Sequence, residues 1–209
     1  MLATDERELS AGGPDDRRRR RVVARTALRI ALARATGRPA ASLELALGPG
    51  GKPVLTEGRG LEFSVSTTGE LCIVALARGA PLGVDVERLV PRDGLERIVD
   101  TRFAPSEAAR IAELDGEDRL RAFYSCWTRK EAYLKAIGSG LARPLREVVV
   151  SVDDEAPTLV AAAGDDPKRW SLGALDLGAE AVGSLAVRAP PPALPPLIGA
   201  RELPLELAG

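Results

Sequence analysis

Two long segments of helical composition, each followed by short β-rich segments, determine which folds this chain can adopt. The first runs from about Asp15 to Ala35, with acidic residues at its start and Gly37 just beyond its end. The second runs from about Glu117 to Ala136 and ends before Gly138. Acidic first turns and a glycine after the last turn are typical of helices. A shorter helix is predicted between them, because Pro105 favours a first helical turn.

Short segments rich in β-branched and aliphatic residues predict strands after each long helix. The first group covers 61–66, 71–77 and 82–87, for which we expect an antiparallel meander, and the second covers 148–152, 159–163, 170–175 and 182–187. A loop, Gly-Pro-Gly-Gly-Lys-Pro at 48–53, precedes the first group. The order helix, loop, sheet thus occurs twice, although no sequence identity repeats at a fixed period. The pattern predicts an α+β fold.

Composition places the chain among globular proteins. Its 209 residues can bury a core without disulfides, and 45% hydrophobic with 28% charged residues is ordinary for that class. Its apolar runs are shorter than the roughly 18 residues of a membrane-spanning helix. The first residues are acidic where a signal peptide would be basic, so we expect a cytoplasmic protein. Cys72 and Cys126 lie in apolar segments and are expected to be buried, reduced thiols.

The chain contains no histidine. Ser-His-Asp triads, Cys-His dyads and HExxH zinc sites are therefore excluded. Catalysis by this chain would have to use carboxylates, lysines and hard cations.

Asp85 and Glu87 lie two residues apart in the Gly-Val-Asp-Val-Glu segment 83–87. On a strand they would face the same side, with Val84 and Val86 directed to the core. Two neighbouring carboxylates are consistent with a solvated sheet face or with a magnesium site, since magnesium binds a few carboxylates and completes its shell with water and phosphate oxygens. The pair alone leaves both interpretations open.

Glu131 and Lys135 are one helical turn apart in the segment Trp-Thr-Arg-Lys-Glu-Ala-Tyr-Leu-Lys at 127–135. In isolation this spacing indicates an i,i+4 salt bridge. The aromatic and aliphatic residues of this helix share a stripe that is typical of a core rather than of a cofactor stack.

Two basic features are ambiguous. The run of five arginines at 17–21 fits a solvated helix start, a nucleic-acid patch or an anion site. An aromatic content of 3% disfavours nucleic-acid binding. Lys52 follows a glycine, but Ala46 and Pro53 occupy the glycine and Ser/Thr positions of a nucleotide-binding phosphate loop, so that interpretation is rejected.

Four motifs in this order, GKP, FSVSTTG, GVDVE and WTRKEAYLKAIGSGL, resemble the 4′-phosphopantetheinyl transferase superfamily, specifically its single-chain, pseudo-dimeric surfactin-synthetase-activating branch. The resemblance extends over about residues 15–187. It implies two similar α+β halves, each a small antiparallel sheet packed on a long helix, with the active site in the cleft between them. We therefore expect halves at 1–95 and 96–188, followed by a proline-rich, solvated tail at 189–209.

The resemblance also implies an activity: magnesium-dependent transfer of 4′-phosphopantetheine from coenzyme A to a serine of an acyl or peptidyl carrier protein, releasing 3′,5′-ADP. Such a holo-[acyl-carrier-protein] synthase would serve polyketide, nonribosomal-peptide or fatty-acid biosynthesis. It would act as a monomer, without nucleic-acid or membrane partners. The alternative is a catalytically weakened homologue that binds coenzyme A or a carrier protein. Thr67 motivates it, because relatives usually have a phosphate-binding histidine there.

Site roles follow from matched motif positions. Asp85, Glu87 and Glu131 would hold magnesium. Glu131 would also take the proton of the carrier serine, and Lys135 would contact the phosphates and stabilise the leaving group. The expected coenzyme A-binding residues are Arg20, Lys52, Ser66, Thr67 and Lys135.

Overall fold

The computed structural model describes residues 15–139, 143–152 and 156–189. The proline-rich segment beyond residue 189 lies outside this part of the chain. The helices are α2 (Asp15–Thr36), α3 (Leu95–Arg102), α4 (Pro105–Ala112) and α5 (Gly116–Ile137). The strands are β1 (Leu45–Leu47), β2 (Pro53–Leu55), β3 (Leu61–Thr68), β4 (Leu71–Arg78), β5 (Leu82–Arg88), β6 (Val148–Val150), β7 (Leu159–Ala162), β8 (Ser171–Leu175) and β9 (Ala181–Val187). The predicted α+β class and both long helices are confirmed.

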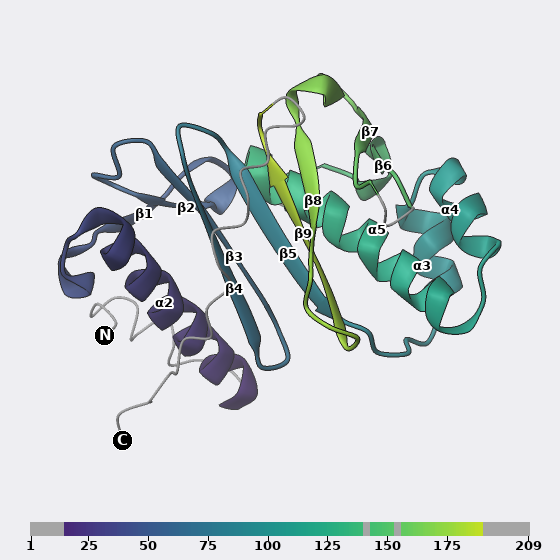
Figure 1. Ribbon diagram of the computed structural model, residues 1–209, viewed down its shortest axis with the longest axis horizontal. Coiled ribbons are helices and arrows are strands. Elements are labelled where there is room, and N and C mark those ends of the chain that lie inside the picture. The colour runs from purple at the N-terminus through teal and green to yellow at the C-terminus, as the bar shows by residue number, and fades with distance from the viewer. Residues whose placement is uncertain (1–14, 140–142, 153–155, 190–209) are drawn as a thin grey trace.

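Helix α2 packs on the antiparallel β3–β4 pair at the N-terminal end of the molecule (Figure 1). Leu28 and Leu32, one turn apart, bury the same helix face against Phe63 of β3. The Arg78 guanidinium donates a hydrogen bond to the Ala35 carbonyl at 3.0 Å, which places the end of α2 beside the start of β3. A small β1–β2 pair precedes these strands.

Helix α5 forms the centre of the second unit. It packs on the three-stranded antiparallel sheet β5–β9–β8, while α4 and β6 contact it elsewhere (Figure 1). Its core is rich in aromatic residues: Phe103 stacks on Phe123, and Tyr133 meets Trp170 edge to face. The core of the second unit contains more buried apolar residues than that of the first, whose core is mainly leucine.

A buried ion pair joins α4, α5 and β6. The Lys130 ammonium lies 2.5 Å from the Glu107 carboxylate, and both side chains are almost fully buried. Lys130 also donates to the carbonyls of Leu145 and Val148, while Glu107 accepts hydrogen bonds from the Ala104 and Val150 amides. Because a buried charge without partners costs several kcal/mol, this full set of contacts is needed to keep the pair inside the core.

Strand β5 does not continue a meander from β4, so that part of the sequence prediction is wrong. It pairs along its whole length with β9, from Leu82 opposite Val187 to Arg88 opposite Ala181. The strand composition was recognised correctly, but pairing depends on contacts remote in sequence. The division into 1–95 and 96–188 remains a prediction, and it would assign β5 and β9 to different halves.

The short elements, the cysteines and the membrane-spanning character of the helices can also be compared with the sequence predictions. Strands β1 and β2 and helix α3 were not predicted, because all three are short, and Pro53, assigned to a loop, begins β2. Both cysteines are free thiols, with Cys126 buried as expected and Cys72 only half-buried. Among the described helices, none combines the length and apolar character that crossing a membrane requires.

Candidate active site

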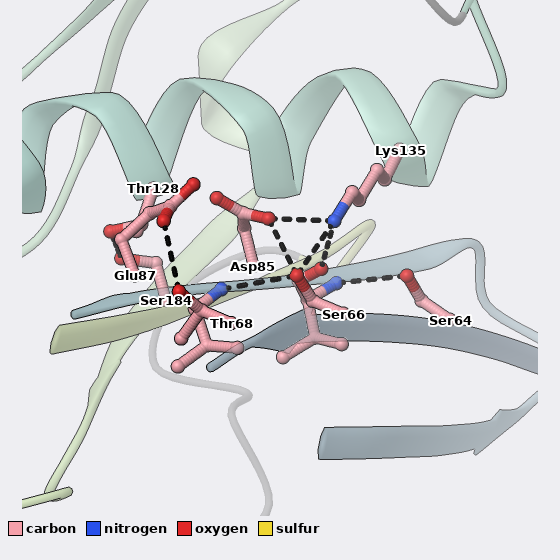
Figure 2. A network of polar contacts seen from close by, with 10 residues as sticks. Ser64, Ser66, Thr68, Asp85, Glu87, Thr128, Lys135 and Ser184 are labelled. Carbon is pink, nitrogen blue, oxygen red and sulfur yellow. Dashed lines mark hydrogen bonds and ion pairs between the residues drawn. The ribbon is translucent and has the colours of Figure 1, made fainter. Parts of the chain in front are cut away.

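Asp85, Ser66 and Lys135 meet where β5, β3 and α5 come together (Figure 2). The Lys135 ammonium donates to Asp85 Oδ1 at 2.6 Å and to the Ser66 hydroxyl at 3.0 Å. The Ser66 hydroxyl in turn donates to Asp85 Oδ1 at 2.8 Å. The i,i+4 salt bridge that spacing alone indicated is therefore not the pair that forms, since Lys135 reaches across to β5.

The second oxygen of Asp85 is unusual. Oδ2 is buried and has no hydrogen-bond partner among the described residues. A buried carboxylate oxygen without a hydrogen-bond partner destabilises the folded protein. Its presence at this position therefore indicates that another group, such as a bound ligand, interacts with it. This is the first structural sign of a binding function at Asp85.

The carboxylates of Glu87 and Glu131 lie close enough to Asp85 for their negative charges to interact with it. Burial raises the pKa of Glu87, and the Asp85 charge raises it further, although Glu87 also accepts a 3.3 Å hydrogen bond from Thr68. Burial likewise raises the pKa of Glu131, followed by the charge of Asp85, while Lys135 opposes the shift. Within the described part of the chain, no three acidic, cysteine or histidine side chains are grouped closely enough to hold a metal as they stand. The carboxylates share one electrostatic environment without forming a closed metal cage.

Hydroxyl groups connect β3 to β5. The side chains of Ser64, Ser66 and Thr68 accept hydrogen bonds from the amides of Val84, Val86 and Arg88 at 3.1, 3.3 and 3.4 Å. These contacts, partly visible in Figure 2, replace a backbone ladder at this junction. Sequence reasoning predicted Ser66 but missed Ser64 and Thr68. The alternation of hydroxyl residues on β3 was the available signal, because alternate residues of a strand face the same side.

Glycines bring α5 and the 48–53 loop close to β5. A Cβ at Gly83 would overlap the Ala132 carbonyl of α5 and approach the Ala136 nitrogen to 2.5 Å. A Cβ at Gly50 would overlap the Gly138 carbonyl just after α5. Glycine at position 83 therefore allows the helix end that carries Lys135 to lie beside the strand that carries Asp85, and glycine at position 50 allows the 48–53 loop to approach the end of α5.

Lys52 lies at the same side of β5 as Lys135. Its ammonium donates to the Leu82 carbonyl at 3.0 Å and lies 3.8 Å from the Glu62 carboxylate. Lys135 donates to the Val84 carbonyl at 3.2 Å, and carbonyls two residues apart on a strand point the same way. Burial lowers the pKa of Lys52, and the nearby Glu62 opposes this change. Two cationic groups therefore lie along one edge of β5.

The remaining predicted residues lie farther from this network. Thr67 is exposed and follows Ser66 on β3, so its side chain faces the opposite side of the strand. Arg20 is exposed near the start of α2, which extends from the Ala35 contact toward the turn joining β3 and β4 (Figure 1). The structure thus groups Asp85, Glu87, Glu131, Ser66, Lys135 and Lys52 near β5 and leaves Thr67 and Arg20 at the periphery.

A buried hydroxyl pair adjoins the carboxylates and was not predicted. Thr128 Oγ1 and Ser184 Oγ lie 2.8 Å apart, and Thr128 also donates to the Ser125 carbonyl. Ser184 is directly opposite Asp85 in the β5–β9 pairing, and Figure 2 shows the pair beside Glu87. No local sequence signal joins residues 128 and 184, because their contact depends on how α5 packs on β9.

Comparison with known proteins agrees with this geometry. Residues 81–187 match the family model described as 4′-phosphopantetheinyl transferase superfamily. A Synechocystis protein provisionally named as a 4′-phosphopantetheinyl transferase is 36% identical over 138 residues, covering 65% of this chain and 56% of that protein. The 4′-phosphopantetheinyl transferase HetI of Nostoc is 34% identical, with 58% and 51% covered.

A crystal structure of a holo-(acyl-carrier-protein) synthase from Bacillus anthracis in complex with CoA (3′,5′-ADP) gives a TM-score of 0.41 at 21% identity, covering 51% of this chain and 93% of that one. The chain spans about half the length of the curated relatives it matches. The family match covers the β5 carboxylates and the whole of α5, and the chain belongs to the 4′-phosphopantetheinyl transferase superfamily.

Proposed function

We propose that this protein transfers 4′-phosphopantetheine from coenzyme A to a serine of an acyl or peptidyl carrier protein and releases 3′,5′-ADP. One observation carries the proposal: the buried carboxylate of Asp85, one oxygen of which has no hydrogen-bond partner among the described residues, lies beside the Lys135 ammonium and within the electrostatic influence of Glu87 and Glu131. An acidic group of this kind next to lysines suits a reaction at a pyrophosphate, where negative charge must be neutralised. Membership of the superfamily supports the same activity.

Magnesium fits the donor set. Asp85, Glu87 and Glu131 provide the hard oxygen ligands that magnesium prefers. Asp85 Oδ2 has no hydrogen-bond partner among the described residues that such a cation would have to replace. Burial, followed by the negative charge of Asp85, raises the pKa values of Glu87 and Glu131, and a bound cation would neutralise the charge that these carboxylates share. When bound, magnesium would neutralise charge on the pyrophosphate oxygens.

Glu131 would act as the proton acceptor. In the transfer, the serine oxygen forms a bond to the β-phosphorus, the bond from that phosphorus to the 3′,5′-ADP oxygen breaks, and the serine proton passes to Glu131. With magnesium beside it, this carboxylate is a weak base, so its value as a proton acceptor lies chiefly in its position. Lys135 would donate to the leaving oxygen, because its side chain is partly exposed beside Asp85.

Lys52, Ser66, Thr67 and Arg20 would bind coenzyme A. The Lys52 ammonium is already directed to the edge of β5 by the Leu82 carbonyl. Arg20 and Thr67 are exposed, which makes them available to the outer phosphates and nucleotide of the ligand. We also propose that the protein acts as a cytoplasmic monomer. The pseudo-symmetric halves at 1–95 and 96–188 would be repeats of one pattern and not independently folding units, because β5 of the first half pairs with β9 of the second.

Intact-protein mass spectrometry tests the function directly. Several apo carrier proteins are incubated with this protein, coenzyme A and magnesium, and parallel samples omit the metal or contain Glu131→Gln. A gain of one phosphopantetheine on a carrier, absent from both controls, is the expected result. Measurable coenzyme A binding without any gain would instead establish the alternative of a binding protein that has lost turnover.

A further inference from the structure

The two oxygens of Asp85 have different surroundings. Oδ1 accepts hydrogen bonds from Lys135 and Ser66, whereas Oδ2 is buried without a partner among the described residues. A buried carboxylate needs a counter-charge, and the Lys135 ammonium provides it at 2.6 Å. In this structure, the stability of the Asp85 charge therefore depends on Lys135.

Lys135 is held less firmly than Asp85. The Lys135 side chain is 32% exposed, whereas Asp85 is 7% exposed and fixed on a paired strand. The other contacts of the ammonium, with Ser66 and the Val84 carbonyl, are 3.0 and 3.2 Å long. A lysine side chain has four flexible methylene groups, so the ammonium can leave Asp85 while the backbone of α5 stays in place.

We propose that Lys135 is a displaceable internal counter-ion, which holds Asp85 until a divalent cation competes for the same carboxylate and releases the ammonium. The inference rests on the proposed function only in taking Asp85 as part of the cation site. Ser66 would remain on Asp85 throughout, because its hydroxyl contacts both Oδ1 and the Val86 amide. The released ammonium is then free to bind the phosphates of the substrate.

This arrangement couples cation and phosphate binding. The apparent cation affinity is reduced by the fraction of molecules in which the Lys135–Asp85 pair is closed. Any anion that binds Lys135 opens the pair and raises the cation affinity, and by linkage the cation raises the affinity for the anion by the same factor. The ion pair would thus favour simultaneous binding of both ligands over binding of either alone.

The test is a titration of the full chain with Mn²⁺ alone, in which the electron paramagnetic resonance signal of free Mn²⁺ measures how much of the ion is bound. Lys135→Gln removes the competitor and is expected to bind Mn²⁺ about 10-fold more tightly than wild type. Lys52→Gln is the matched control, since it removes an equal charge at the same edge of β5 but no contact to Asp85. Its effect is expected to be clearly smaller. An equal effect of both variants, or no tightening in Lys135→Gln, would overturn the inference.

A second measurement uses the wild-type protein and does not depend on the folding of a variant. Nuclear magnetic resonance of the ¹⁵N-labelled lysine side chains is recorded while Mg²⁺ is added. The Lys135 signal is expected to shift, and that of Lys130, buried against Glu107, should stay unchanged. A Lys135 signal that does not respond at saturating Mg²⁺ would reject the displacement. Carrier modification with no displacement refutes this inference alone, whereas absence of both Mn²⁺ binding and modification refutes the proposed function as well.

Discussion

At the scale of single residues, the proposed proton acceptor Glu131 lies where burial destabilises its charged form. Burial and the Asp85 charge raise its pKa in the folded protein. A carboxyl with a raised folded pKa contributes stability at low pH and loses that contribution as the pH rises through the folded pKa. The metal-free protein therefore carries an electrostatic penalty at neutral pH.

Glu131→Gln should separate these two effects. We expect kcat/KM for carrier modification to fall by about 100-fold or more, because the variant lacks the proposed proton acceptor. The metal-free variant should be as stable as wild type at mildly acidic pH and more stable at neutral pH. Urea unfolding of both proteins across this range, without metal, measures the difference. If the metal-free variant were less stable than wild type at neutral pH, the electrostatic penalty assigned to Glu131 would be contradicted.

Thr67→His examines a residue at which the sequence resemblance indicates a departure from the family pattern. Thr67 is exposed on β3, so the substitution should change the free energy of unfolding by only about 0.5 kcal/mol or less. If the neighbouring loop keeps the family geometry, the imidazole adds a phosphate contact, and kcat/KM for coenzyme A should stay the same or rise several-fold. Steady-state kinetics at varied coenzyme A checks this. A clear decrease would mean that the site has been rebuilt around threonine.

Local sequence patterns identified several site residues but not their partners. Strand alternation correctly placed Asp85 on a different face from Val84. Helical spacing, however, indicated Glu131 as the partner of Lys135, and the structure pairs Lys135 with Asp85. The contact joins residues far apart in the sequence, and only the packing of α5 on β5 creates it.

At the scale of elements, the close approach of α5 to β5 depends on Gly83. Gly83→Ala would place a methyl group against the α5 backbone, which cannot rotate away as a side chain can. We expect a loss of about 3 kcal/mol in the free energy of unfolding and weaker metal binding, because α5 must move and carry Lys135 and Glu131 with it. Urea unfolding and Mn²⁺ titration measure the two effects.

A second glycine provides the control for that prediction. Gly79→Ala has open space around the new methyl group, although its φ of +72° makes alanine strained. It should lose about 1 kcal/mol and keep the metal affinity of wild type. Equal losses in the two variants would show that backbone conformation, and not helix contact, sets the cost at Gly83.

The hydroxyl connection between β3 and β5 can be tested at Ser64, which lies away from the carboxylates. Ser64→Ala leaves the buried Val84 amide without its acceptor, and we expect a loss of about 1 to 3 kcal/mol in the free energy of unfolding. Thr56→Ala, which removes an exposed hydroxyl bonded to the Glu44 carbonyl, should cost much less. Chemical denaturation of both variants distinguishes them. Similar small losses would mean that water replaces the Ser64 oxygen.

At the scale of the whole molecule, the sequence predicted the elements better than their assembly. The two long helices and most strands were found because their signals are local. The expected meander failed because the β4–β5 turn suggests pairing with β4, whereas β5 bonds to β9 and meets β3 through hydroxyl groups. Such a junction has no backbone pairing pattern that alternating hydrophobicity could reveal.

The pairing of β5 with β9 predicts where the chain can be divided. A fragment of residues 81–189 keeps the β5–β9–β8 sheet and its contact with α5, whereas a fragment of residues 96–189 loses β5. In the shorter fragment, Ala132 and Ala136 lose the strand that covers them, and β9 retains only β8, a two-stranded sheet of marginal stability.

We therefore expect fragment 81–189 to unfold cooperatively on heating and fragment 96–189 to show a broad, weak transition. Circular dichroism recorded during heating measures both. Fragment 81–189 also loses the hydroxyl acceptors of β3, but the freed amides of Val84, Val86 and Arg88 would then face water, which can bond them. Equal cooperativity of the two fragments would show that β5 is dispensable for the C-terminal unit and would favour a boundary at residue 95. Cooperative folding of the longer fragment alone would place the structural boundary before β5.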